Sequence, residues 1–183
     1  MKNYAILLAA GNSTRMQGID KLTLELSGKM VIEYSIETLF KHKLIDHITI
    51  VTSKNNSNKI QSIISMNKYK KPFNFVEGGE TRFSSFVNAF KTITSSEIII
   101  IHDAARPNFS LNLIFSLFKN LKKYKCVVPA IKTNDSVKLK NKNQIINLKR
   151  ENIYLTQTPQ AFDYRELYKL QKDQSSNITD DAN

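Results

Sequence analysis

An apolar segment near the N-terminus, followed by a turn of small residues, limits the fold of this chain more than any other feature. Residues 4–8 read Tyr-Ala-Ile-Leu-Leu, which has the length and composition of a buried strand. Ala9-Ala10-Gly11 follows, and Arg15 and Lys21 come a few positions later. Small residues let backbone N–H groups approach a phosphate closely, and the basic side chains supply fixed positive charge. The segment therefore predicts a loop that binds a nucleotide triphosphate.

This loop does not have the spacing of the common phosphate-binding motifs. G-x-x-x-x-G-K-[ST] is absent, and G-x-G-x-x-G fails at Ser13. An ordinary turn between a strand and a helix would also place small residues here. The pattern Ala9-Ala10-Gly11-x-x-x-Arg15-Met16, with Lys21 following, is more specific. It resembles the glycosyltransferase-like nucleotidyltransferases, in which this segment wraps the triphosphate.

The same strand-like composition recurs along the chain. The runs cover residues 4–8, 47–52, 73–77, 97–101, 125–131 and 153–156. Between them, apolar side chains at helical spacing predict amphipathic helices. Their apolar positions are Ile32, Ile36, Leu39 and Phe40, then Phe83, Phe86, Val87 and Phe90, and finally Leu113, Ile114, Leu117 and Leu121 after an N-cap at Ser110. The alternation predicts an α/β fold: one domain over residues 1–183, Rossmann-like, three-layered α/β/α, with a mostly parallel, doubly wound sheet.

The fourth predicted strand ends in a loop rich in functional residue types. Residues 98–101 are all isoleucine and can be buried as a central strand, and His102-Asp103-Ala104-Ala105-Arg106-Pro107 follows. Ligands of doubly wound sheets bind at the carboxyl ends of the strands, so this loop and the first loop are expected to border one crevice. Asp103 suits Mg²⁺, which takes one or two protein oxygens and fills its shell with water and phosphate. A turn or cap role for Asp103 is the alternative, and for His102 we expect a structural role.

A third loop of this kind follows the third predicted strand. Gly78-Gly79 allows close backbone approach to a base or ribose, and Ser85 lies one helical turn beyond Thr81. With the other loops at the same sheet edge, it would form a third wall of one pocket.

The stretch at about residues 132–151 breaks the α/β pattern. It is polar and rich in Lys and Asn, yet residues 136–140 and 144–148 alternate as strands do. We predict a β-hairpin arm that turns around residues 140–143. Because an isolated hairpin is marginally stable in water, the arm is expected to rest on a second subunit. A loose basic loop is the alternative.

Short motifs appear in a fixed order along the chain. They are Ala9-Ala10-Gly11-x-x-x-Arg15-Met16, Asp20-Lys21, Gly78-Gly79-x-x-Arg82-x-x-Ser85, His102-Asp103-Ala104-Ala105-Arg106-Pro107, Thr158-Pro159-Gln160 and Thr179-Asp180-Asp181-Ala182. Together they resemble the 2-C-methyl-D-erythritol 4-phosphate cytidylyltransferase family of the non-mevalonate isoprenoid pathway, whose fold is the glycosyltransferase-A-like nucleotidyltransferase fold. The resemblance runs from Ala5 to the last residue, and H-D-A-A-R-P with T-P-Q is its most specific part.

The resemblance implies an activity and a role for each matching residue. The family transfers CMP from CTP to 2-C-methyl-D-erythritol 4-phosphate, which gives 4-diphosphocytidyl-2-C-methyl-D-erythritol and pyrophosphate, with Mg²⁺ as cofactor. The implied catalytic residues are Arg15, Lys21 and Arg150. The implied nucleotide-binding residues are Ala9, Ala10, Gly11, Gly78, Gly79, Ser85, Asp103 and Ala104, with Asp103 also the metal ligand. The implied substrate-binding residues are Arg106, Ser136, Arg150, Thr158 and Thr179. Ser136 stands where a threonine is usual, and Arg150 reaches the neighbouring subunit's site in the family, which implies a homodimer joined through the arm.

The chain departs from the family pattern at its end. Asn183 comes directly after the T-D-D-A motif, whereas in the family a further segment follows, with an Asn-x-Lys-x-Thr strand whose lysine positions the substrate. Some relatives continue into a fused cyclodiphosphate synthase domain. We therefore expect the C-terminal end to be truncated.

Charge and composition narrow the class of protein. The net charge of +11 suits phosphorylated substrates, and it would also suit nucleic acid. Cys126, the single cysteine, lies in an apolar run and is expected to be buried. A single cysteine cannot form an internal disulfide, no apolar stretch is long enough to span a membrane, and no leader precedes the first predicted strand. We therefore expect a cytoplasmic protein with no membrane or nucleic-acid partner.

Alternative functions stay open at this point. Ribitol-5-phosphate cytidylyltransferase would share the CTP loops and differ around Arg106, Arg150 and Thr158. A basic RNA-binding protein would explain the charge, although the aromatic-rich signature of RNA recognition is missing. A catalytically silent homologue would keep the fold without the activity.

Overall fold

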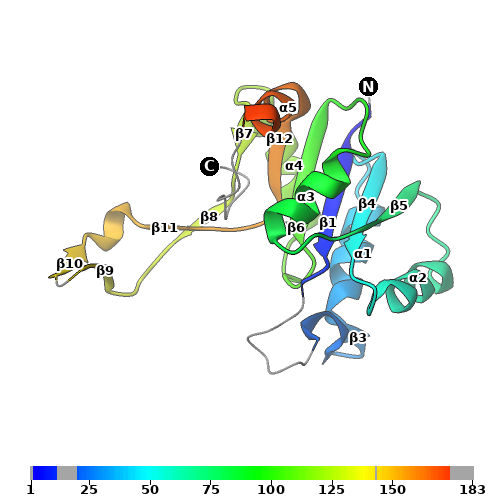
Figure 1. The fold of residues 1–183 in the computed structure, drawn as a ribbon, viewed down its shortest axis with the longest axis horizontal. Coiled ribbons are helices and arrows are strands. Elements are labelled where there is room, and N and C mark those ends of the chain that lie inside the picture. The colour runs from blue at the N-terminus through cyan, green and yellow to red at the C-terminus, as the bar shows by residue number, and fades with distance from the viewer. Residues whose placement is uncertain (1, 12–19, 143, 174–183) are drawn as a thin grey trace.

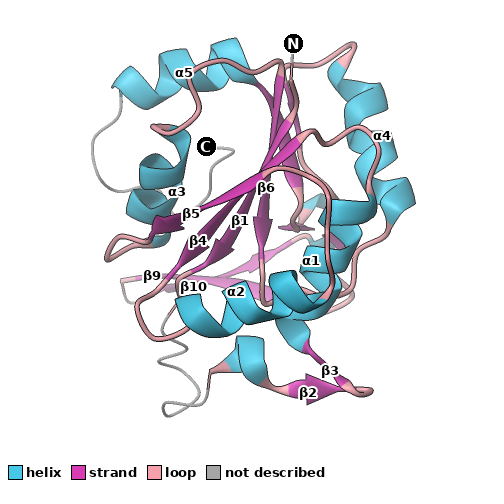
Figure 2. Ribbon diagram, turned by 90° about the vertical axis from the view of Figure 1, so that its right-hand side faces the viewer, coloured by secondary structure: helices cyan, strands magenta, loops and turns pink. Residues whose placement is uncertain are grey.

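Alternating strands and helices build a mixed sheet with helices on both faces (Figures 1 and 2). The computed structural model describes residues 2–11, 20–142 and 144–173. The strands of the main sheet are β1 (Tyr4–Ala9), β4 (His47–Thr52), β5 (Phe73–Glu77), β6 (Ile98–Asp103), β7 (Cys126–Val127) and β12 (Gln160–Asp163). The helices are α1 (Val31–Lys41), α2 (Ser57–Met66), α3 (Arg82–Phe90), α4 (Leu111–Leu121) and α5 (Tyr164–Asp173), and a short hairpin of β2 (Glu25–Leu26) and β3 (Lys29–Met30) precedes α1.

The order of the strands confirms the predicted mostly parallel sheet. It is β5-β4-β1-β6-β12-β7, in which β5, β4, β1 and β6 run parallel. β12 is antiparallel both to β6 and to β7. The chain leaves β1 toward β4 on one side and returns to β6 on the other, so the carboxyl ends of β1 and β6 meet at the switch in strand order. Ligands of such sheets bind at this switch point.

Alternate side chains of each central strand face opposite layers of the core. Leu7 packs in one cluster with the apolar positions of α1, α2 and α4, while Ile6 packs in another with Phe86 and Phe90 of α3 and Leu167 of α5. The buried residues of both clusters are at most 8% exposed. The predicted apolar stripes of the helices therefore lie in the core, as the three-layer arrangement requires, and Ser110 caps α4 by accepting from Leu113 N–H.

The strands that follow α4 differ from those expected. The run at residues 125–131 is split at Val128-Pro129, so that β7 stays in the main sheet and β8 (Ala130–Lys132) leaves it. β7 is an edge strand that pairs with β12, which leaves Cys126 exposed. The expectation that Cys126 is buried is therefore wrong. β12 was not expected, because its four residues include Gln160 and Asp163 and show no apolar run.

An arm projects from the body of the molecule (Figure 1). β8 pairs with β11 (Tyr154–Thr156) to form its stem, and β9 (Val137–Asn141) pairs with β10 (Gln144–Leu148) to form the expected hairpin. A 3-10 turn, η3 (Arg150–Asn152), joins the hairpin to the stem. The arm thus runs from Ala130 to Thr156, which is longer than the expected 132–151, because the stem strands belong to it. Within the described part of the chain, no helix is long and apolar enough to cross a membrane.

Candidate nucleotide-binding site

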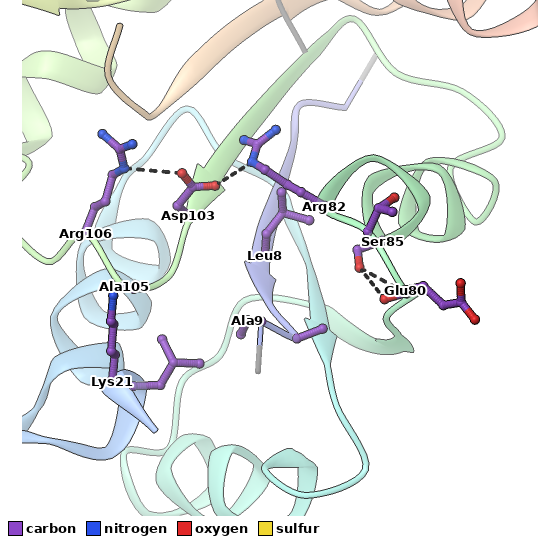
Figure 3. A pocket seen from close by; sticks show the side chains of 14 residues that line it. Leu8, Ala9, Lys21, Glu80, Arg82, Ser85, Asp103, Ala105 and Arg106 are labelled. Atoms are coloured by element: carbon purple, nitrogen blue, oxygen red, sulfur yellow. Dashed lines mark hydrogen bonds and ion pairs between the residues drawn. The ribbon is translucent and has the colours of Figure 1, made fainter. Parts of the chain in front are cut away.

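A pocket of about 600 Å³ opens at the carboxyl ends of β1 and β6 (Figure 3). The loops after β1, β5 and β6 all contribute to it, as the sequence predicts. Its lining consists of Leu8, Ala9, Ala10, Gly11, Lys21, Leu22, Gly79, Glu80, Thr81, Arg82, Ser85, Asp103, Ala105 and Arg106. Most of the residues expected to bind the nucleotide are therefore brought together, although their positions are far apart in the sequence.

Other expected site residues lie behind the pocket, in the arm or outside the described chain. Ala104, the first residue of the loop after β6, and Thr158, which supports this loop, are both buried, and Gly78 packs behind the pocket wall. Ser136 and Arg150 belong to the exposed arm, which projects from the main sheet (Figure 1), and neither lines this chain's own pocket. Arg15 and Thr179 lie outside the described residues, so their predicted roles stay predictions.

Lys21 reaches the pocket from the short 3-10 turn η2 (Lys21–Thr23). Asp20 caps this turn, because its Oδ1 accepts from the backbone N–H of Leu22 at 3.0 Å. Leu22 itself is 4% exposed and packs in the core beside α1. The capping residue Asp20 before Lys21 and the buried Leu22 after it hold the backbone of Lys21 at the carboxyl end of β1.

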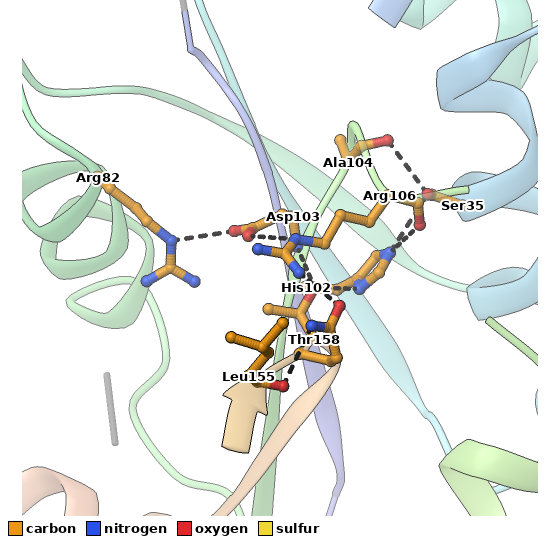
Figure 4. Close-up of polar contacts among 9 residues, drawn as sticks. Ser35, Arg82, His102, Asp103, Ala104, Arg106, Leu155 and Thr158 are labelled. Carbon is orange, nitrogen blue, oxygen red and sulfur yellow. Dashed lines mark hydrogen bonds and ion pairs between the residues drawn. The ribbon is translucent and has the colours of Figure 1, made fainter. Parts of the chain in front are cut away.

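Asp103, at the end of β6, is the centre of the pocket's charge. Its Oδ1 accepts from Arg82 Nε at 3.0 Å, and its Oδ2 pairs with Arg106 Nε at 3.2 Å (Figures 3 and 4). The Asp103 side chain is 25% exposed, which is enough for a small ligand to reach it. One carboxylate thus orients two guanidinium groups at the pocket mouth, and a guanidinium fork suits phosphate oxygens.

The loop after β6 is held from below by His102, which is completely buried. Its Nε2 lies 3.1 Å from the carbonyl oxygen of Arg106, which can only accept, so Nε2 carries the proton. Nδ1 is then the acceptor for the hydroxyl of Thr158 at 2.9 Å, while the Thr158 oxygen accepts from the backbone N–H of Asp103 at 3.2 Å. This chain of hydrogen bonds fixes the backbone of Asp103 and Arg106 (Figure 4).

Burial keeps His102 neutral. Desolvation lowers its pKa to about 4, and this effect outweighs the opposing attraction of the Asp103 carboxylate. A second proton on Nδ1 would also displace the hydrogen bond from Thr158. The expected structural role of His102 is confirmed, because both ring nitrogens are engaged in holding the loop.

The glycines after β5 allow two loops of the protein to touch. A Cβ at Gly78 would overlap the Cβ of Ala10 and lie 3.1 Å from Ser85 Oγ, and one at Gly79 would overlap Ser84 Oγ. Gly79 N–H donates to Ser85 Oγ at 3.0 Å. The close approach therefore occurs between protein atoms, and contact of these glycines with a base or ribose stays a prediction.

Arg82 in the pocket and Asn56 behind it are given no role by the sequence analysis. Arg82 belongs to a recognised motif, and its position at the first turn of α3 carried a usable signal: a cation there opposes the helix dipole, which suggests an anionic partner. The sequence around Asn56 contains no such signal. Asn56 Nδ2 donates to the carbonyl of Ala9 at 2.8 Å and holds the end of β1 from the N-cap position of α2, a contact between positions 47 residues apart.

The donor set limits the kind of metal site that this pocket could form. Among the described residues there is no group of three or more His, Cys, Asp or Glu side chains placed to hold a metal ion. Two carboxylate residues line the pocket, Glu80 and Asp103, and Asp103 lies between the arginines. So few carboxylates fit Mg²⁺, which is commonly bound through one or two of them together with substrate phosphates, and do not fit a site built wholly from protein ligands.

The fold and the pocket together define a class of protein. Backbone loops and basic side chains converge around one carboxylate at the switch point of a parallel sheet, which is the arrangement of an α/β enzyme that binds a phosphorylated nucleotide.

Comparison with known proteins gives the family. A sequence model of 2-C-methyl-D-erythritol 4-phosphate cytidylyltransferase matches residues 4–183, so the chain belongs to this family. It is 42% identical over its full length to the bifunctional enzyme IspD/IspF of Pelagibacter ubique, of which it covers 49%, and thus spans about half of that relative. The enzyme of Clostridium tetani, named as the cytidylyltransferase, is 38% identical over 99% of this chain and 76% of its own length. The crystal structure of 4-diphosphocytidyl-2C-methyl-D-erythritol synthase from Anaerococcus prevotii superposes with a TM-score of 0.84 at 32% identity, covering 99% of this chain and 79% of that one.

Proposed function

We propose that the chain carries the cytidylyltransferase activity of its family: transfer of CMP from CTP to 2-C-methyl-D-erythritol 4-phosphate, with release of pyrophosphate. The observation that carries the proposal is the pocket itself, which Lys21 lines and in which Arg82 and Arg106 pair with the carboxylate of Asp103. This pocket offers positive charge on several sides to a triphosphate. Membership of the family supports the choice of nucleotide and acceptor.

The reaction needs charge stabilisation more than acid–base chemistry. A phosphate monoester has a second pKa near 6, so the acceptor is already largely a dianion at neutral pH. One of its oxygens attacks the α-phosphorus of CTP, the bond to the β-phosphate oxygen breaks, and pyrophosphate carries the electron pair away. Lys21 would stabilise the charge on the transferring group, and Arg106 would hold the acceptor phosphate. His102 takes no part in proton transfer, because it is buried and engaged in hydrogen bonds.

We propose Mg²⁺ as the cofactor, with Asp103 as its protein ligand. The ion would neutralise charge on the phosphates when bound. Each carboxylate oxygen of Asp103 pairs with one guanidinium group, and its second lone pair would be available to the ion.

The arm supports a proposal of a homodimer. It exposes large apolar side chains, among them Ile131 (56%), Ile145 (67%) and Tyr154 (54%), which a second copy would cover. Arg150 and Ser136 lie in the arm and would then serve the partner's pocket, where the acceptor phosphate binds. We place the reaction in the cytoplasm, with no nucleic acid or membrane as partner.

The test is a pyrophosphate-release assay with CTP, Mg²⁺ and either polyol phosphate. Turnover with 2-C-methyl-D-erythritol 4-phosphate and not with ribitol 5-phosphate supports the proposal. The opposite preference would make this a ribitol-5-phosphate enzyme. No turnover with either acceptor would reject the activity for this chain, and a salt titration of RNA binding would then test the remaining explanation for the charge.

A further inference from the structure

A continuous series of polar contacts joins the stem of the arm to the pocket (Figure 4). Gln157, directly after β11, accepts a hydrogen bond on Oε1 from Arg106 Nη1 at 2.8 Å. Arg106 Nε pairs with Asp103, which in turn pairs with Arg82 of α3. The arm stem and the helix on the far side of the pocket are thus connected through side chains alone.

The contacts of Gln157 leave its amide only one orientation. Its Nε2 donates to the carbonyl oxygen of Leu155 at 3.2 Å, and a carbonyl oxygen accepts only. Oε1 must therefore face the guanidinium of Arg106, which donates only. The backbone N–H of Gln157 donates to the carbonyl oxygen of Pro129, the residue just before β8, at 2.8 Å. The residue thus contacts Leu155 of β11 through its side chain and Pro129, directly before β8, through its backbone.

Arg106 needs such support more than its neighbours do. Its side chain is 45% exposed, and it is long enough to adopt many rotamers at the pocket mouth. Asp103 holds it on one side through Nε, and Gln157 holds it on the other through Nη1. Two acceptors on different atoms of a planar group fix its rotation as well as its place.

We infer that Gln157 is a positioning residue that sets the guanidinium of Arg106 for the acceptor phosphate and ties it to the arm. The inference rests on the proposed function, in which Arg106 binds that phosphate. Nothing in the backbone contact to Pro129 requires a glutamine, since any residue except proline supplies the N–H. The amide side chain is what reaches Arg106.

The test removes the hydrogen-bond acceptor of the Gln157 side chain and keeps the size of the side chain. Gln157→Met has a side chain of similar length without the oxygen, and we expect KM for the polyol phosphate to rise about tenfold while KM for CTP and the melting temperature stay close to those of the parent. Gln157→Glu keeps an acceptor and should recover most of the loss. Gln61→Met, on the exposed face of α2, is the matched control and should behave as the parent.

A double-mutant cycle asks whether Gln157 acts through Arg106. In an Arg106→Lys background, Gln157→Met should raise KM for the polyol phosphate much less than in the parent, because the contact is already lost. Equal effects in both backgrounds would overturn the inference. So would an unchanged KM for the polyol phosphate in an active Gln157→Met protein. If Gln157→Met does not fold, Gln157→Leu supplies the same comparisons.

A further readout does not depend on activity. A hydrogen bond to Nη1 slows rotation about the Nε–Cζ bond, so the two Nη signals of Arg106 should be separate by NMR in the parent and merged in Gln157→Met. If the parent shows no turnover, the proposed function fails, and this spectrum alone decides the inference. Identical Nη signals in parent and variant would overturn it.

Discussion

At the scale of single residues, Lys21 tests the proposed chemistry most directly. Its backbone is fixed by the Asp20 cap and by buried Leu22, so Lys21→Ala should remove the charge without disturbing the loop. If the ammonium stabilises charge that develops only in the transition state, kcat should fall by about 10²–10³ while KM for CTP changes little. Lys59→Ala, on the exposed face of α2, is the control and should leave kcat unchanged. An unchanged kcat would contradict the role.

Asp103 is predicted to matter for metal-dependent nucleotide binding. Asp103→Asn keeps the shape but loses the charge, and its amide has one acceptor oxygen to face the two arginines that pair with Asp103. We expect the affinity for Mg²⁺ in the presence of CTP to fall about tenfold or more, measured by calorimetry, with the fold retained in circular dichroism. Glu25→Gln, an exposed residue of β2, should leave that affinity unchanged. Equal Mg²⁺ dependence in Asp103→Asn and parent would place the metal elsewhere.

His102 predicts a pH dependence of stability. Its pKa is about 4 in the folded protein and about 6.5 in the unfolded chain, so the unfolded state binds the proton more readily between these values. Stability is therefore complete above pH 6.5 and falls as the pH drops toward 4, by about 3 kcal/mol for this group.

Urea unfolding measured from pH 7 to pH 4.5 checks this prediction. His102→Gln starts from a lower free energy of unfolding, because it loses the fitted ring, but it should show a shallower decline over this range. Carboxylates titrate in both proteins, so the difference between the two slopes isolates the histidine. Parallel declines would show that His102 does not control the acid response.

At the scale of elements, the sequence predicts the parts of the fold whose signals are local. β4 and β5 have the expected bounds, and the apolar stripes of α1, α3 and α4 face the core, because a short apolar run and a helical stripe are both defined by residues close together in the sequence. The residues at the ends of β1 and β6 were also identified, since a parallel sheet brings the carboxyl ends of its strands to one edge.

The elements that were missed depend on tertiary contacts. β12 is buried between β6 and β7, and its Gln160 and Asp163 hide it from an apolar pattern. Cys126 is exposed because β7 lies at the sheet edge, which its apolar neighbours do not reveal. The role of Gln157 likewise depends on the arm stem, whose strands are separated by the whole hairpin.

The close contact between the loop after β1 and the loop after β5 gives a prediction at this scale. A Cβ on Gly78 would overlap that of Ala10, so Gly78→Ala must push the two loops apart. Overpacking of this kind costs about 1–3 kcal/mol, which lowers the melting temperature by roughly 2–12 °C for a domain of this size. Gly11→Ala is the matched control for stability, because its Cβ would meet no atom within 4 Å. Equal melting temperatures for the two variants would show that the contact between these two loops is not tightly packed.

At the scale of the whole molecule, the pocket and the arm are separate parts that the proposed dimer would bring together. Arg150 contacts Glu151 and the carbonyl of Asn134, both within the arm, and does not line its own chain's pocket. An arm with exposed Ile145 and Tyr154 is costly to leave in water. In a two-fold dimer, what one arm provides to its partner must be returned by the other.

This reciprocity predicts that two inactive proteins can restore each other. Asp103→Asn damages the pocket and Arg150→Ala damages the arm, so each homodimer should be nearly inactive. After subunit exchange, every mixed dimer has one site with both lesions and one site with neither, because pocket and arm come from different chains. Equal amounts give about half mixed dimers, so roughly a quarter of the sites should regain activity in the pyrophosphate assay. If Arg150 served its own subunit's pocket, every site in a mixed dimer would carry one lesion, and exchange verified by mass spectrometry would restore nothing. That result would reject the shared site while leaving the proposed reaction to be judged by the parent enzyme alone.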